Sequence, residues 1–160
     1  MTLYTELTTD PQALGYAPMI AAGNHAGLHE RINRPEASRM LPRTRFITGR
    51  GVLAELGAVG ALILEKLSVF GSIPQQGEAE NLRLALKWAM KFAEQEGEGL
   101  DIGHPTTRGL LQICATTGVL TQGEATSLMS LAVFPTSRAF ELFGRDIQLN
   151  EISEVLNHGG

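Results

Sequence analysis

The sequence predicts an all-α protein, a compact single domain of about seven to nine short helices. Leucine occurs 22 times against 15 for valine and isoleucine together, and alternating apolar and polar residues are almost absent, which favours helices over sheets. The 18 glycines are costly inside a helix and common just after its end, so the helices should be short and often interrupted. A length of 160 residues fits one core.

The clearest local signals lie between Gly99 and Ala132. Pro105 is a favoured first helical residue, and Gly118 is a typical stop. A second helix begins at Thr121, where Glu124 completes a capping box, a pair of residues in which each side chain accepts a hydrogen bond from the backbone of the other. This stretch therefore predicts two short helices joined by a tight turn.

Before this hairpin, the first third of the chain predicts only short helices. They are Leu3–Leu7, a helix that begins at Asp10-Pro11 and ends at Gly15, then Ala17–Ala22 and His25–Asn33. Asn24 is the predicted cap of the last one, whose inner side holds Leu28 and Ile32. The apolar content is too low for this region to fold alone.

Residues 34–51 have two prolines and many arginines, a composition typical of an extended arm. Within it, Arg43–Thr48 could form a short edge strand, with Asp146–Leu149 as the only expected partner. The predicted domain organisation has three parts that fold as one unit: a short-helix region over 1–33, the arm over 34–51 and a helical core over 52–160.

The core begins with the most apolar segment, Val52–Phe70, which predicts a helix kinked at Gly57 and buried on several sides. Glu78–Gln95 is the longest regular helix, and we expect its Leu82, Leu86, Trp88 and Phe92 to be core residues. The acidic run Glu94–Glu98 should be its solvated exit.

After the hairpin, Phe134-Pro135 predicts a break in the chain. Thr136 or Ser137 can then cap a helix that runs through Phe143 and ends at Gly144. Asn150 is the predicted cap of a last helix, which turns its apolar residues inward: Ile152, Val155 and Leu156.

Few residues suggest catalysis or metal binding. The single cysteine, Cys114, excludes an intrachain disulfide and a cysteine metal cluster, and lies on an apolar face where a core role is typical. His25 and His29 are four residues apart and Glu30 follows, but the metalloprotease motif needs its glutamate directly after the first histidine, where Ala26 stands. We expect no enzyme activity, cofactor or metal.

Two further sites have a functional and a simpler interpretation. Asp101 and His104 precede a helix whose first turn could hold an anion, or they could only fix the loop. The predicted hairpin could be a helix-turn-helix that binds DNA, but its second helix has no lysine or arginine, so the attraction to phosphate is missing there.

The charge distribution is uneven. Residues 31–50 contain one acid, Glu36, and carry a formal +5, which leaves −9 on the rest of this −4 chain. The six arginines of this segment form the candidate partner-binding site: Arg31, Arg34, Arg39, Arg43, Arg45 and Arg50. The planar guanidinium suits carboxylates on a neighbouring subunit, whereas the simpler interpretation is that these arginines pair with acids of the same chain.

Five segments stand out as motifs: ELTTDPQALGYA (Glu6–Ala17), LALKWAMKF (Leu84–Phe92), GLDIGHPTTRGLL (Gly99–Leu111), GVLTQGEATSLMSLA (Gly118–Ala132) and PTSRAFELFGRDI (Pro135–Ile147). They resemble segments of small proteins encoded by tailed bacteriophages, in the same order over nearly the whole chain. The resemblance implies a structural component of the virion, associated with the tail, baseplate or tail fibres, or alternatively a capsid decoration protein.

We therefore expect a non-enzymatic virion subunit, made in the bacterial host cytoplasm, that binds other virion proteins through the arginine-rich arm. No run of residues approaches the length that spans a bilayer, so no membrane association is expected. Nucleic acid is not an expected partner because the acidic remainder of the chain would repel phosphates. The competing class is a DNA-binding regulator that uses the helical hairpin.

Overall fold

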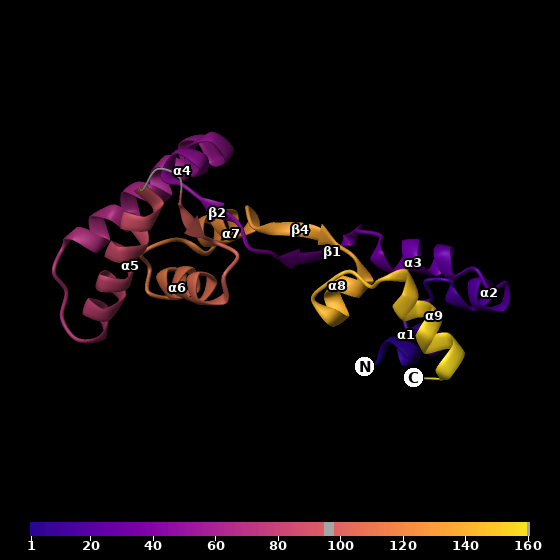
Figure 1. Cartoon of the computed structure of the whole chain (residues 1–160). Coiled ribbons are helices and arrows are strands. Elements are labelled where there is room, and N and C mark those ends of the chain that lie inside the picture. Colours follow the sequence, from indigo (N-terminus) through magenta and orange to yellow (C-terminus); the bar gives the residue numbers. More distant parts are fainter. Residues whose placement is uncertain (95–97, 160) are drawn as a thin grey trace. The chain divides into compact units, whose positions relative to one another are not determined.

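A computed structural model describes residues 1–94 and 98–159, which form helices and two small sheets (Figure 1). The prediction of a mostly helical fold is confirmed. The nine helices in the described residues are α1 (Leu3–Thr9), α2 (Tyr16–Ala21), α3 (His25–Asn33), α4 (Gly49–Ser72), α5 (Glu78–Glu94), α6 (Pro105–Thr116), α7 (Gln122–Ser130), α8 (Arg138–Phe143) and α9 (Leu149–His158). None of the helices described has the length and apolar character needed to cross a membrane.

Two small sheets of two strands each accompany the helices. The first sheet pairs β1 (Glu36–Pro42) with β4 (Val133–Thr136), and the second pairs β2 (Phe46–Ile47) with β3 (Leu100–Asp101). In the second sheet the strands are antiparallel, with Phe46 opposite Asp101 and Ile47 opposite Leu100.

The contacts divide the chain into two compact units. Unit 1 comprises Met1–Leu41 with the described residues of Phe134–Gly160, and unit 2 comprises Pro42–Val133. The boundaries expected from sequence composition, at residues 33/34 and 51/52, differ from those of the two units, which are defined by packing. Folding of the whole chain as one unit stays a prediction.

Unit 1 has its own apolar core, built from short helices at both ends of the sequence. Its fully buried side chains include Tyr16, Leu28, Ile32 and Ile152. The Asn24 side chain accepts a hydrogen bond from the Gly27 N–H at 2.9 Å, which confirms the predicted cap of α3. Packing of α3 and α9 against each other thus joins the beginning of the chain to its end.

The predicted short helix between Asp10 and Gly15 is wrong. Asp10 instead ends α1 with a left-handed backbone (φ 41°), and its carboxylate accepts hydrogen bonds from the backbone N–H groups of Leu14, Gly15 and Tyr16. An aspartate that satisfies three successive backbone donors holds the segment as a loop, because its side chain replaces the bonds that a helix would make.

Unit 2 packs α4 to α7 around a second core. Ile63, Leu86, Leu111 and Cys114 are among its buried side chains, and burial raises the pKa of the Cys114 thiol to about 11. The predicted kink in α4 is confirmed, since Gly57 has φ 56° and ψ −129°, a conformation that only glycine adopts at low cost.

The predicted hairpin is present as α6 and α7. Pro105 opens α6, and Gly118 follows its end with φ 79°. Thr121 and Glu124 form the predicted capping box of α7, and hydrogen bonds to Lys66 and the Thr121 backbone lower the pKa of Glu124. The 2.7 Å Lys66–Glu124 ion pair joins α4 to α7.

The prediction for the strands is correct for the position of one strand and wrong for its partner. Arg43–Thr48 does contain a strand, β2, but it pairs with β3 and not with Asp146–Leu149. Glycine permits this pairing, because a Cβ on Gly103 would collide with the backbone of Arg43. Leu149 instead begins α9, which is capped by Gln148 and not by Asn150.

One further difference precedes α8. Phe134-Pro135, the predicted break in the chain, belongs to β4. Of the two candidate caps, Thr136 and Ser137, it is Ser137 that caps α8, and Gly144 ends the helix as predicted. Of the expected acidic exit, Glu94–Glu98, the middle residues 95–97 lie outside the described residues, and Glu94 is the last residue of α5.

Candidate functional site

One side of α4 carries exposed apolar residues. Its inward side is formed by Gly60, Ile63 and Leu67, which are buried. Leu62 and Val69, seven residues apart and therefore on one side of the helix, are 49% and 44% exposed. The sequence predicts that this helix is buried on several sides, whereas the structure buries only the side that faces the core.

The neighbouring helix α5 has the same two-sided character. Leu82 and Leu86 are buried as predicted, but Trp88 and Phe92 are not core residues, being 56% and 44% exposed. With Leu84 at 41%, they form an exposed apolar stripe at a spacing of four residues. The helix is apolar over a wider arc than the core of unit 2 covers.

A groove of about 490 Å³ runs between α4 and α5, which lie side by side in Figure 1. Its α4 wall has small residues, among them Ser68 and Gly71, and its α5 wall carries Trp88 with two lysines. The Lys91 ammonium lies 4.9 Å from the centre of the Trp88 ring, a cation–π contact. A hollow of about 400 Å³ extends this groove and is lined by Glu65 and Glu94.

We call this surface the outer face of α4 and α5, defined by Leu62, Val69, Leu84, Trp88 and the groove between the two helices. An exposed tryptophan beside a groove that also carries lysines, with further exposed apolar side chains on the same two helices, is typical of a protein-binding surface. Its groups are suited to bind a polypeptide rather than to carry out acid–base or nucleophilic chemistry.

The predicted partner-binding arginines have several environments. Glu36 accepts hydrogen bonds from Arg31 at 2.7 Å and from Arg39 at 2.9 Å, and Arg39 also contacts Glu141 at 3.2 Å. In unit 1 the arm is thus held, at these positions, by acids of its own chain, which is the simpler interpretation of their charge.

The other arginines of the candidate site are less uniform. Arg45 pairs with Glu55, and its guanidinium also donates to the backbone carbonyl of Leu131. Arg43 is half-buried in unit 2. Arg34 and Arg50 are exposed and form no ion pair within residues 1–94 and 98–159. Among the six arginines, these two are accessible, and their substitution would break no ion pair of the described chain.

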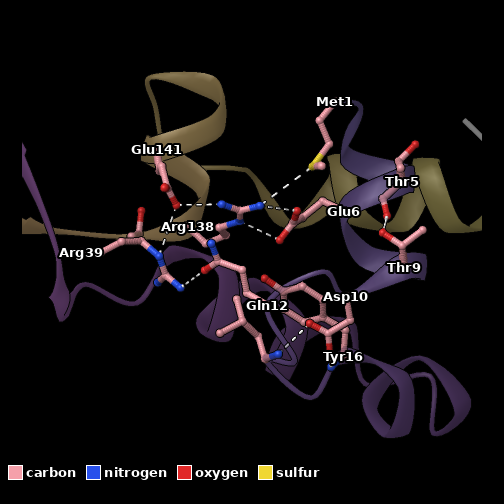
Figure 2. A network of polar contacts seen from close by, with 12 residues as sticks. Met1, Thr5, Glu6, Thr9, Asp10, Gln12, Tyr16, Arg39, Arg138 and Glu141 are labelled. Carbon is pink, nitrogen blue, oxygen red and sulfur yellow. Dashed lines mark hydrogen bonds and ion pairs between the residues drawn. The ribbon is translucent and has the colours of Figure 1, made fainter.

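Sequence reasoning missed the most buried charged group of unit 1. Arg138 donates to both oxygens of Glu6, from Nε at 2.8 Å and from Nη2 at 2.9 Å, and a third bond reaches Glu141 (Figure 2). Glu6 is fully buried, and its hydrogen bonds raise the pKa of Arg138 above the ordinary value. Glu6 and Arg138 are 132 positions apart, so no local pattern signals this pair.

The ion pairs form one chain of alternating charges in unit 1. It runs from Arg31 through Glu36, Arg39, Glu141 and Arg138 to Glu6. Figure 2 shows its inner part, where Glu141 lies between the guanidinium groups of Arg39 and Arg138. Burial and the nearby Glu6 carboxylate raise the pKa of Tyr16, which lies in the same core. The arrangement joins separate segments of unit 1 and has a structural function.

The remaining candidates have structural contacts too. The Asp101 carboxylate accepts from the backbone N–H groups of Arg45 and Gly103, and His104 caps α6. These contacts agree with a loop-fixing role. His25 forms a 2.9 Å hydrogen bond with Ser153, and the described residues hold no group of three or more potential metal ligands.

The comparisons with known proteins add no relative. No protein family, no curated protein and no solved structure matches this chain.

Proposed function

We propose that this chain is a non-enzymatic structural subunit that binds other protein subunits, and that it belongs to the virion of a tailed bacteriophage. Its place would be the tail, the baseplate or a tail fibre. The observation that carries subunit binding is the outer face of α4 and α5, where Trp88 is 56% exposed. The phage setting rests on the sequence resemblance alone.

An exposed apolar surface on two regular helices supports protein binding for a thermodynamic reason. Covering apolar area stabilises by about 25 cal/mol per Å², and tryptophan is among the residues that contribute most to interfaces. The helices also present this surface on a rigid element, so little conformational entropy is lost when a partner covers it.

The arginine-rich arm supplies a second expected contact, now centred on Arg34 and Arg50. Substituting Arg39 or Arg45 by glutamate would break ion pairs within the chain and place like charges together. The double variant Arg34→Glu/Arg50→Glu avoids that, because both side chains are exposed. It therefore tests whether the arm contacts other subunits without breaking an ion pair inside the chain.

The test is incorporation into phage particles produced with the variant gene. Wild-type chain should co-purify with intact virions, and low-resolution imaging of a tagged chain should locate it at the tail. Arg34→Glu/Arg50→Glu and Leu62→Glu/Trp88→Glu should each reduce its amount per particle. The matched control is Ile113→Glu, because Ile113 is as exposed as Leu62 but lies on α6.

The outcomes separate the alternatives. Absence of the wild-type chain from purified virions would reject the virion proposal, and label on the head would favour a capsid decoration protein. Particles that contain normal amounts of both double variants would reject the two surfaces as assembly contacts.

A further inference from the structure

We infer that the outer face of α4 and α5 binds a second copy of this chain, so that these two helices of two molecules form a four-helix arrangement around a two-fold axis. This inference deepens the proposed function and depends on the same surface. It names the partner, which the proposed function leaves open.

The first step is that α4 is apolar on both sides. Between Leu56 and Ser72 its only charged residues are Glu65 and Lys66, and Lys66 is already paired with Glu124 inside unit 2. A helix that is hydrophobic all round is typical of a buried position. The core of unit 2 covers one side, and the side with Leu62 and Val69 needs a second cover.

The second step is the distribution of charge along the groove. Lys87 and Lys91 line the part near the α4–α5 connection, beside Gly71 and Ser72. Glu65 lines the part further along, and Glu94 borders both parts. One end of the groove is therefore basic and the other acidic.

This polarity fits a second copy turned end to end. A two-fold axis across the middle of the groove places the lysines of each chain opposite the glutamates of the other. Interfaces of this kind are self-complementary, because each patch meets its own copy in reverse. A partner with charge of one sign would match only one end.

The third step is shape. Ser68 borders both parts of the groove and therefore lies near its middle, and Gly71 and Ser72 continue the low wall on α4. Such small residues leave room for a ridge of larger ones. On the opposite wall the groove carries Trp88, a large and exposed side chain, so each copy offers both a low wall and a side chain that can pack against it.

The self-association is measured by analytical ultracentrifugation across a concentration series. The wild-type chain should pass from monomer to dimer. Trp88 is the only tryptophan and is exposed in the single chain, so its fluorescence should shift to shorter wavelength over the same range. Trp88→Ala should weaken dimerisation by about thirtyfold, as for an interface residue of high contribution.

A charge exchange tests the two-fold arrangement directly. Lys87→Glu/Lys91→Glu makes both ends acidic, and Glu65→Lys/Glu94→Lys makes both ends basic, so each variant alone should be monomeric. A mixture of the two should form a heterodimer. Because pairing in the mixture requires both chains to be folded, this result also excludes misfolding as the cause of the losses.

A cross-link tests the register. Ser68→Cys should react with its counterpart through a short bifunctional maleimide, since Ser68 lies beside the proposed axis. Ser130→Cys, exposed on α7, is the control and should give little dimer. The native Cys114 is buried and should not react in the folded chain.

Three results would overturn the inference: a wild-type chain that is monomeric at every concentration, a dimer that Trp88→Ala leaves unchanged, or charge variants that fail to pair when mixed. Its failure is distinct from failure of the proposed function. A monomeric chain that still enters virions would reject the dimer alone, and a dimer absent from virions would reject the virion role alone.

Discussion

The two units of this chain differ in which side chains they bury and which they leave exposed. Unit 1 places charged groups in its interior, where Glu6 is fully buried against Arg138. Unit 2 keeps its charges outside and leaves apolar side chains exposed. Of the large exposed hydrophobic residues in the described chain, four belong to unit 1 and ten to unit 2.

The difference teaches that the two units depend on different interactions. Unit 1 is assembled from segments far apart in the sequence, and ion pairs join them. Unit 2 is one continuous segment whose helices pack by apolar contacts. The outer face of α4 and α5 carries further apolar side chains that the unit leaves exposed. Substitutions should therefore destabilise unit 1 through charge and unit 2 through volume.

The largest effect is expected in the interior of unit 1. Arg138→Met leaves the Glu6 carboxylate buried without its partner, which should lower the free energy of unfolding by about 3–5 kcal/mol. Urea titration followed by circular dichroism measures the change. The double variant Glu6→Gln/Arg138→Met should lose less, because no unpaired charge remains; an equal or larger loss would contradict this explanation.

The same titration tests whether the chain folds as one unit. Both tyrosines, Tyr4 and Tyr16, lie in unit 1, and the single tryptophan, Trp88, lies in unit 2. If folding is shared, Arg138→Met should shift the tyrosine and tryptophan transitions together. A shift of the tyrosine signal alone would contradict the predicted single folding unit.

The second effect concerns two leucines of α5 that differ in exposure. Leu86 is 1% exposed, and Leu86→Ala should cost about 2–4 kcal/mol because it removes buried methyl groups and leaves a cavity. Leu84 is 41% exposed, and Leu84→Ala should cost less than about 1 kcal/mol in the monomer. Urea midpoints read from Trp88 fluorescence at low concentration give both values, and equal losses would place Leu84 in the core.

Sequence reasoning succeeded where the signal is local. The kink at Gly57, the capping box of Thr121 and Glu124, and the cap at Ser137 each depend on residues within one helical turn. It failed where the signal is long-range. The pairing of β1 with β4 joins residues about ninety positions apart, and no pattern in either strand names the other.

The candidate site illustrates the same limit from another side. The sequence predicts Trp88 and Phe92 of α5 as core residues, because periodicity cannot tell a core from a second interface. Only packing shows that Trp88 and Phe92 lie outside. The arginines of the arm were recognised by composition, but their partners Glu36 and Glu141 depend on the fold.

The third effect concerns a helix start in unit 2. The Thr121 hydroxyl accepts from the Glu124 N–H at 3.2 Å, so Thr121→Ala removes one half of the capping box and should cost about 1 kcal/mol. Thr126→Ala, at an exposed position inside α7, is the control and should be nearly neutral. Similar losses for both variants would show that the cap contributes nothing specific.

The smallest effect is expected for an exposed ion pair of unit 1, between Arg145 and Glu151 at 2.5 Å. Arg145→Gln should lower the free energy of unfolding only slightly, since the Arg145 side chain is 56% exposed and water and salt screen the pair. Hydrogen bonds from Arg145 and from the Gln148 backbone lower the pKa of Glu151 from 4.5 to about 2.

A lowered carboxyl pKa stabilises the folded chain above the unfolded value, and this contribution is lost as the pH falls toward the folded value. The stability difference between wild type and Arg145→Gln should therefore be constant above about pH 4.5, decline below it and vanish near pH 2. High salt should shrink it throughout. A difference that survives at the acid end would assign the effect to packing of the arginine stem, and the contrast with the buried Glu6–Arg138 pair would then be one of contact area as well as of charge.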